Sequence, residues 1–253
     1  MKVLYWDLET AQNLVALFQL AHNDFVDPAN IVRERYIICG SWMWEGESKV
    51  KAVSVLDDPK RYDKDPYDDY HVVKALHEVL SQADVIIGHN SDNFDKKWLD
   101  TRILFHGLEP LPPIASIDTY KVAKKRFYLN SNKLDYIGRL LKVGKKLPTT
   151  SGLWMRVLRG DSKAIKEMVS YNKQDVILLK DVFYKLRPYV DTHVNRELYG
   201  QVGCPRCGSK KVQSRGVHKA ITRTYQRFCC SACGGWFRLL KSDKNSTTTF
   251  HVI

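Results

Sequence analysis

Two carboxylates separated by one residue end the first apolar stretch of the chain. The stretch is Val3–Thr10, and its acids are Asp7 and Glu9. On a β-strand, residues two apart point to the same face, so the two side chains would project together. Oxygen ligands of this kind suit hard divalent cations such as Mg²⁺. Alone, the pair is equally compatible with two solvated acids at a strand end, so the assignment depends on residues elsewhere.

Two further carboxylates lie where helices are expected. Asp95 follows the apolar run Val85–Gly88 through a loop and begins a helical pattern. Asp175 lies four residues after Tyr171, so their side chains share one helix face. Apolar residues surround that face, and an unpaired buried carboxylate is costly. A metal ion and a substrate would supply the missing partners.

Four cysteines near the C-terminus have the spacing of a metal site. Cys204 and Cys207 form one C-x-x-C pair, and Cys230 and Cys233 form another after twenty-two residues. Two such pairs predict a tetrahedral Cys₄ site for one structural Zn²⁺, with no open coordination position. Clustered pairs also favour a reducing compartment over disulfides. We place Cys229 outside the site because, paired with Cys233, it gives the poorer spacing C-x-x-x-C.

The positive charge of the chain is unevenly distributed. Its 253 residues include 40 Lys or Arg and 28 Asp or Glu, a net charge of +12. Residues 201–253 carry ten basic residues and one acid, which leaves +3 for residues 1–200. In this C-terminal part Arg223, Tyr225 and Arg227 alternate cations with an aromatic ring, a pattern that can bind phosphates and stack unpaired bases. A surface that docks another protein is the alternative interpretation.

The elements that position these residues form a mixed sheet with flanking helices. An antiparallel group of strands comes first, and strands then alternate with helices, which predicts an α/β fold. Expected strands are 2–9, 35–44, 49–56, 84–88 and 114–118. Expected helices are 70–82, a helix from Asp95 through Leu104, 119–129, 131–143 with Ser131 or Asn132 as its cap, and one or two helices over 161–187.

The remaining segments are expected to be irregular or separate from this sheet. Residues 57–69 are expected to form a loop, and residues 11–34 an excursion with a short helix that is either a lid or simple packing. Residues 1–190 would form the α/β domain and 191–202 a linker. A small β zinc ribbon would follow at 203–240, and 241–253 would be a disordered polar tail.

Taken in order, the acidic motifs resemble those of the DEDD 3′–5′ exonucleases, which have the ribonuclease H-like (DnaQ-like) fold. The tyrosine at position 171 of the third motif resembles the one that marks the DEDDy branch. This branch includes the proofreading domains of B-family DNA polymerases. The start of the chain is also similar to stand-alone exonucleases of phages and prophages. The resemblance covers about residues 1–190 and rests on Asp7-x-Glu9, Asn93-Phe94-Asp95, Tyr171-x-x-x-Asp175, Asn90, and the stretches 9–11, 35–44, 116–119, 132–136 and 171–179.

The resemblance implies a two-metal mechanism with two Mg²⁺ or Mn²⁺ ions at the scissile phosphate. Asp7 would bridge both ions, and Glu9 and Asp175 would complete the site of the attacking water. Asp95 would support the second ion through water, and Tyr171 would orient the attacking water. The residues expected to line the substrate cleft are Thr10, Asn90 and Phe94.

The expected substrate is single-stranded DNA or a DNA 3′ end, cleaved to 5′-mononucleotides. RNA cleavage, a structure-selective endonuclease and a non-catalytic recruitment protein are the alternatives, although the intact acids argue against the last. A polymerase or another replication or repair protein is a possible partner. No secretory signal and no apolar run near ~18 residues is present, so we expect a cytoplasmic protein, in the host cytoplasm if phage-encoded, with no membrane contact.

Overall fold

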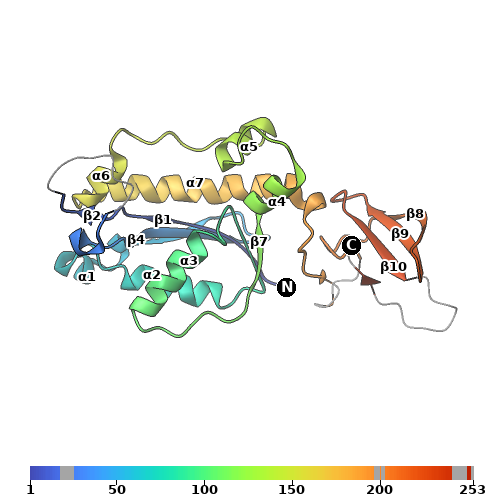
Figure 1. Ribbon diagram of the computed structural model, residues 1–253, viewed down its shortest axis with the longest axis horizontal. Coiled ribbons are helices and arrows are strands. Elements are labelled where there is room, and N and C mark those ends of the chain that lie inside the picture. The colour runs from blue at the N-terminus through green and yellow to red at the C-terminus, as the bar shows by residue number, and fades with distance from the viewer. Residues whose placement is uncertain (18–25, 197–199, 201–202, 241–249, 252–253) are drawn as a thin grey trace.

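A five-stranded mixed sheet forms the centre of the larger part of the molecule (Figure 1). The computed structural model describes residues 1–17, 26–196, 200, 203–240 and 250–251. The strand order is β5-β4-β1-β6-β7, with β1 antiparallel to β4 and parallel to β6. The mixed sheet predicted from the sequence is therefore confirmed. Its strands are β1 (Val3–Thr10), β4 (Ile37–Trp44), β5 (Lys51–Ser54), β6 (Val85–Gly88) and β7 (Ala115–Asp118).

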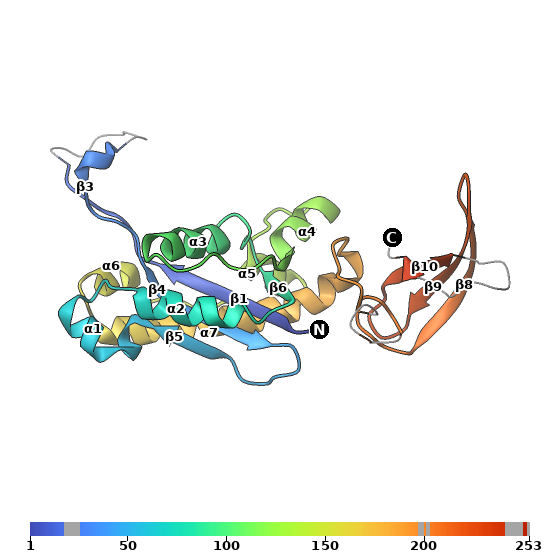
Figure 2. The ribbon, with the colours of Figure 1, turned by 90° about the horizontal axis from the view of Figure 1, so that it is seen from below.

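Helices cover both faces of this sheet. The long helix α7 (Ser162–Leu186) crosses one face, and α2 (Tyr70–Leu80) and α3 (Asp95–Phe105) lie on the other (Figures 1 and 2). α4 (Thr119–Arg126), α5 (Leu134–Leu140) and α6 (Leu153–Leu158) pack against α7. Within the described residues, no helix is both long enough and apolar enough to cross a membrane.

Strand β1 divides its side chains between two cores. Its even-numbered residues are buried in the core that contains α2, because successive side chains of a strand point to opposite faces. Its odd-numbered residues face α7, where Tyr5 packs edge-on against Phe183 with 5.8 Å between ring centroids. Asp7 and Glu9 continue the odd-numbered series. The alternation therefore directs both carboxylates toward α7.

Helix α7 has clear start and stop signals. Asp161 is its N-cap and accepts hydrogen bonds from the backbone N–H groups of Lys163 and Ala164. Pro188 follows its end, inside the short 3-10 helix η3 (Arg187–Tyr189). One buried stripe, including Met168 and Val176, faces the sheet. The prediction of a helix over 161–187 is confirmed as a single helix.

Residues 57–69 are not the expected loop. They contain the end of the 3-10 helix η2 (Val55–Asp57) and the helix α1 (Pro59–Lys64). Asp58 accepts a hydrogen bond from the backbone N–H of Arg61, and Pro59 occupies the first turn. An acidic N-cap followed by proline is a favourable helix start, so the sequence does carry this signal.

Residues 14 and 15 are not in the helix expected within 11–34. β2 (Leu14–Val15) pairs antiparallel with β3 (Ile31–Arg33), which follows the 3-10 helix η1 (Pro28–Asn30). Leu14 is 41% exposed and Leu17 is 49% exposed, so these side chains do not pack into the core. Residues 18–25 of the expected helix lie outside the described residues. The pairing joins segments far apart in sequence, which helical spacing within one segment does not reveal.

Two details near α5 also differ from expectation. Its N-cap is Lys133, whose side chain makes no capping hydrogen bond, so neither Ser131 nor Asn132 is the cap. The short helix α6 was not expected, and it follows Gly152, whose φ of +69° suits a residue without Cβ. Both helices are too short for a repeated apolar pattern to predict their ends.

The C-terminal part is a small antiparallel sheet beyond the end of α7 (Figure 1). Its core is small: the rings of Phe228 and Phe237 stack with centroids 5.4 Å apart, next to the cysteines. Residues 241–249 and 252–253 of the expected tail lie outside the described residues, as do 197–199 and 201–202 of the expected linker. The strands are β8 (Val212–Lys219), β9 (Thr224–Cys230), β10 (Trp236–Leu240) and β11 (Phe250–His251).

Candidate active site

β1 and α7 bring three predicted carboxylates together. Oxygen atoms of Asp7, Glu9 and Asp175 all lie within 4.8 Å of one another. Asp7 and Glu9 are half-buried, whereas Asp175 is buried. The pairs Asp7/Glu9 and Tyr171/Asp175 each share a face, as their spacing predicts, and the packing of α7 across β1 makes the two faces meet.

The carboxylates repel one another, and their pKa values reflect this. Burial raises the pKa of Glu9 to about 8, and the charge of Asp175 adds to the effect. Burial raises the pKa of Asp7 well above its usual range, with further contributions from Asp95 and Glu9. Burial also raises the pKa of Asp95 to about 7. A divalent cation among these groups would favour their ionised forms.

Two oxygen atoms at the site lack a partner. Oδ1 of Asp175 and Oδ1 of Asn172 are buried and accept no hydrogen bond from any described residue. An unsatisfied buried acceptor is costly, and oxygen is the ligand atom that Mg²⁺ and Mn²⁺ prefer. The donor set of Asp7, Glu9 and Asp175 therefore fits a hard divalent cation.

Lys146 supplies a positive charge inside the site. Its Nζ donates to Oδ2 of Asp175 at 2.5 Å and to the hydroxyl of Tyr171 at 3.1 Å. Burial alone would lower the pKa of Lys146, but Asp175, Asp7 and these hydrogen bonds raise it above its ordinary value. This lysine is not predicted from the sequence. It lies between α5 and α6 in an irregular segment, where no periodicity indicates which lysine points inward.

Asn172 was also missed. Its Nδ2 donates to Oδ2 of Asp7 at 2.7 Å, and its side chain is fully buried. It directly follows Tyr171 on α7, so it approaches Asp7 from the same helix that carries Asp175. A buried amide that donates to a carboxylate fixes the orientation of that carboxylate. Only its position inside an otherwise apolar helix stripe could have drawn attention to it.

Asp95 lies beside the three-carboxylate group, not within it. Its Oδ1 accepts a hydrogen bond from the backbone N–H of Leu8 at 3.1 Å, and the residue is 3% exposed. β6 pairs with β1 only as far as Tyr5, so Asp95 satisfies a β1 donor beyond the end of that pairing. The expected support of a second metal ion by Asp95 stays a prediction.

A cavity of about 410 Å³ opens beside Asp7. Of the residues expected to contact substrate, Asn90 lines it, whereas Thr10 and Phe94 are not among its lining residues. Phe94 is 36% exposed and packs edge-on against Trp98. The lining residues are Asp7, His89, Asn90, Tyr120, Lys133, Leu134, Asp135, Lys146 and Tyr171.

His89 occupies a structural position at the cavity wall. Its Nε2 donates to the backbone carbonyl of Asn132 at 2.8 Å, and its Nδ1 lies 2.9 Å from the hydroxyl of Thr119. Burial lowers the pKa of His89 to about 4, so the ring is neutral near pH 7. Both ring nitrogens are therefore engaged within the protein, which agrees with a positioning function for this histidine.

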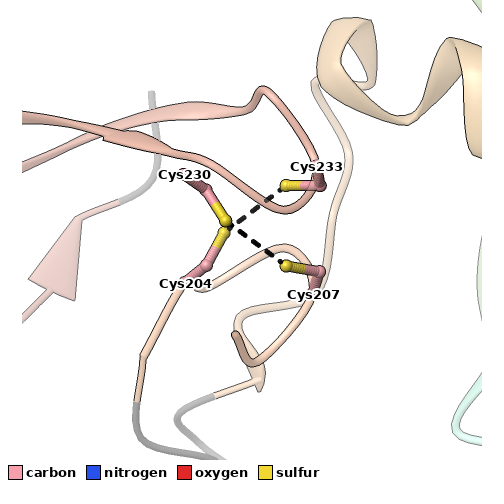
Figure 3. A group of neighbouring side chains, drawn as sticks. All are labelled: Cys204, Cys207, Cys230 and Cys233. Carbon is pink, nitrogen blue, oxygen red and sulfur yellow. Dashed lines mark hydrogen bonds between the residues drawn. The ribbon is translucent and has the colours of Figure 1, made fainter. Parts of the chain in front are cut away.

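The four predicted zinc ligands converge from two loops (Figure 3). The Sγ atoms of Cys204 and Cys233 are 3.7 Å apart, as are those of Cys207 and Cys230. A regular tetrahedron with Zn–S bonds of ~2.3 Å has edges of about 3.8 Å, so the group fits one Zn²⁺. Cys229 lies outside this group, with its Sγ 3.9 Å from the carbonyl of Gly234.

Comparisons with known proteins agree with this geometry. A family model of the RNase_H superfamily matches residues 33–187, which include Asp95, Tyr171 and Asp175. A family B DNA polymerase from the hyperthermophilic archaeon Pyrobaculum calidifontis has a similar fold, with a TM-score of 0.53 and 13% sequence identity. The likeness covers 88% of this chain but only 31% of that polymerase.

No curated protein matches the sequence. The polymerase likeness, at its low identity, concerns the fold alone. The family match spans more than half of the chain and includes the part of α7 that faces β1. The chain therefore belongs to the RNase H superfamily.

Proposed function

We propose that the protein is a metal-dependent 3′–5′ exonuclease of the DEDDy type that hydrolyses single-stranded DNA to 5′-mononucleotides. The observation that carries the proposal is the group of Asp7, Glu9 and Asp175, whose oxygens lie within 4.8 Å of one another beside Tyr171 and an open cavity. Membership of the RNase H superfamily supports nuclease chemistry at such a group.

The proposed site holds two Mg²⁺ or Mn²⁺ ions. When bound, they would supply an activated water and neutralise the charge that develops on the phosphate. Asp7, Glu9 and Asp175 provide the oxygen ligands, with Asp95 in support. Asn172 donates to Oδ2 of Asp7 and thereby leaves the other oxygen of that carboxylate free to face the cavity.

Tyr171 is suited to position water, not to remove a proton from it. Burial, followed by the charge of Asp175, raises the pKa of its hydroxyl above the ordinary value. The hydroxyl therefore stays protonated near pH 7 and acts through hydrogen bonds. Lys146 contacts both Tyr171 and Asp175, so a cation that takes Oδ2 of Asp175 would displace its ammonium group toward the phosphate.

The chain segment that supplies one side of the cavity favours a polyanionic substrate. Residues 119–146, which supply four of its lining side chains besides Lys146, contain nine basic residues and one acid. Lys124, Lys133 and Lys145 form no ion pair with a carboxylate among the described residues. Phosphate groups of a nucleic acid would supply these lysines with counter-charges.

The direction of cleavage and the preference for DNA are part of the proposal. The fold shared with a family B DNA polymerase supports both, although it is a likeness of fold. RNA cleavage and endonuclease action on the same site are the competing possibilities. A polymerase or repair protein as partner, and an origin in a phage, extend the same proposal.

The test is cleavage of single-stranded DNA and RNA of one sequence, each labelled at the 5′ end, with Mg²⁺ or Mn²⁺. We expect a ladder that shortens from the 3′ end of DNA, absent in Asp7→Ala and unchanged in Asp100→Ala, an exposed acid of α3. Circular single-stranded DNA should stay intact. Cleavage of the circle would favour an endonuclease, a ladder on RNA alone would change the substrate, and no cleavage at all would contradict the proposal.

A further inference from the structure

The two faces of the C-terminal sheet carry different side chains. Phe228 of β9 lies directly opposite Phe237 of β10, and both pack with the zinc-ligand cysteines. Residues one position along each strand point to the other face. There Arg227 lies directly opposite Arg238. We call this second face the open face, and it carries His218, Tyr225, Arg227, Trp236 and Arg238.

Rings and cations interleave on the open face. The guanidinium carbon of Arg238 lies 4.2 Å from the ring centroid of Tyr225, and the ring of His218 lies 6.3 Å from the same ring. Trp236 is 49% exposed, so a large aromatic surface meets solvent. Aromatic rings beside cations on a β surface form the kind of platform on which unpaired bases stack.

The open face also carries positive charge without a counter-charge. Like charges directly opposite each other destabilise a sheet, and neither Arg227 nor Arg238 pairs with a carboxylate among the described residues. Residues 203–240 contain eight basic residues and no acid. A row of phosphates would satisfy these groups.

We propose that the open face binds single-stranded DNA, with phosphates on Arg227 and Arg238 and bases stacked on Tyr225 and Trp236. This inference rests on the proposed function in one respect: the strand on the open face would be the same strand that enters the active site. Single strands fit better than duplex because their base faces are free to stack. The complete absence of acids from 203–240 makes a polyanion the matching partner.

The distance between the active site and the open face makes binding depend on the length of the DNA strand. Asp175 lies eleven residues before the end of α7, and the sheet lies beyond that end (Figure 1). At ~1.5 Å per helical residue, the strand must span at least about 16 Å, which is about five nucleotides of a stacked strand with a rise of ~3.4 Å. A trinucleotide would reach the active site alone, whereas a strand of about 20 nucleotides would reach both.

The experiment measures binding of fluorescent oligothymidylate of about 20 nucleotides by anisotropy, in the full-length Asp7→Ala protein with its zinc retained and without Mg²⁺. We expect Arg227→Gln/Arg238→Gln to weaken binding about tenfold or more and to reduce the slope of log K against log salt by about 1.4, as for two lost phosphate contacts. Trp236→Ala should weaken binding about tenfold with the slope unchanged, because stacking releases no counterions.

The matched control is Lys210→Gln/Lys219→Gln, which removes the same charge. Lys219 pairs with Thr224 and so lies on the opposite face, and Lys210 precedes β8. This control should bind within about twofold of the parent, since it keeps both phosphate contacts. The inference is overturned if the open-face variants bind like the parent, if the control loses as much affinity, or if duplex of the same length binds as well as the single strand.

Cleavage separates this inference from the proposed function. On the wild-type background, Trp236→Ala should raise KM for the strand of about 20 nucleotides and leave cleavage of a trinucleotide unchanged. An equal loss on both lengths would contradict the open-face inference and leave the exonuclease proposal standing. If the binding measurements agree with the open-face inference but the wild type cleaves neither strand, the exonuclease proposal is contradicted and the open-face inference stands.

Discussion

At the scale of single residues, Lys146 would compete with a bound metal ion for the carboxylate of Asp175. Its ammonium group lies 2.5 Å from Oδ2 of Asp175, so a cation on the unpartnered Oδ1 of the same carboxylate would lie close to this positive charge. In the metal-free protein this lysine balances part of the acidic charge, as its raised pKa indicates. Lys146 thus pairs Asp175 in the metal-free site, and this pairing would lower the affinity of the site for a divalent ion.

Lys146→Gln should therefore bind Mn²⁺ more tightly than the wild type. The ion would no longer have to displace an ammonium group, and we expect a gain of about threefold to tenfold, or about 1 kcal/mol. Isothermal titration with Mn²⁺ measures the affinity. Lys145→Gln, an exposed neighbour, should leave it unchanged. Weaker binding by Lys146→Gln would mean that the lysine assists the ion instead of competing with it.

The raised carboxylate pKa values also predict how stability depends on pH. A carboxyl group whose pKa is higher in the folded state binds more protons there than in the unfolded chain. Its contribution to the free energy of unfolding therefore falls as pH rises from about 4.5 toward the folded value, about 8 for Glu9. The metal-free protein should lose stability across this range, and Mg²⁺ or Mn²⁺ should restore it.

Asp7→Asn tests this pH dependence. Asparagine removes the charge but keeps an oxygen that can accept from Asn172. Near pH 8 without divalent ions we expect Tm to rise by about 2–4 °C, or about 1 kcal/mol for a protein of this size. As pH falls below 3.8, the ordinary pKa of Asp, the carboxyl group is protonated in both the folded and the unfolded state, so the gain should vanish. A gain independent of pH would show that charge repulsion is not its cause.

At the scale of elements, the sequence predicts the sheet and α7 well because burial repeats along them. β1 alternates, and α7 combines a capping Asp161 with a buried stripe. Single inward-facing residues are harder to predict. Lys146 lies in a segment without periodicity, and Asn172 resembles any polar helix residue until the approach of β1 is known. The β2–β3 pair escaped prediction because its pairing is not local.

Asp95 joins two elements, since its carboxylate at the start of α3 accepts a hydrogen bond from the backbone of β1. Asp95→Ala would leave the buried N–H of Leu8 unsatisfied and should cost about 1–3 kcal/mol in the free energy of unfolding. Asp95→Asn keeps an acceptor and should retain most of that stability. Urea unfolding compares the two variants.

Activity of the same variants distinguishes the two functions of Asp95. If Asp95 also supports a metal ion, Asp95→Asn should lose cleavage by about a hundredfold or more while it stays folded. If its function is only to satisfy Leu8, Asp95→Asn should cleave nearly as well as the wild type, and only Asp95→Ala should be impaired.

At the scale of the whole molecule, hydrogen bonds connect the C-terminal part to the end of α7. Arg206 lies between Cys204 and Cys207 in the sequence, and its Nη1 donates to the carbonyl of Pro188 at 2.6 Å. Glu45, in the loop between β4 and β5, accepts from Arg187 at 3.1 Å and from Arg196 at 2.6 Å. The expected boundary at 190 and the linker at 191–202 are thus crossed by contacts that composition alone does not reveal.

Removal of Glu45 should loosen this junction. Glu45→Ala would leave the nearly buried Arg187 and Arg196 without their shared carboxylate. Because Glu45 is itself 21% exposed, we expect a cost of about 2 kcal/mol, below the ~3–5 kcal/mol of a fully buried pair. Glu47→Ala is the matched control in the same loop, since Glu47 forms only an exposed pair with Lys51 that contributes little.

Limited proteolysis with a non-specific protease, followed by mass spectrometry, measures this effect. Glu45→Ala should be cut faster between residues 191 and 196 than the wild type or Glu47→Ala, because this segment opens more often when its contacts to both parts are weakened. The cysteine site should still bind zinc, since its four ligands are unchanged. Equal cleavage rates in all three proteins would mean that Arg206 and the short 3-10 helix η3 hold the junction without Glu45. In that case the open face would keep its position relative to the active site, and the length dependence of cleavage would be unaffected by Glu45→Ala.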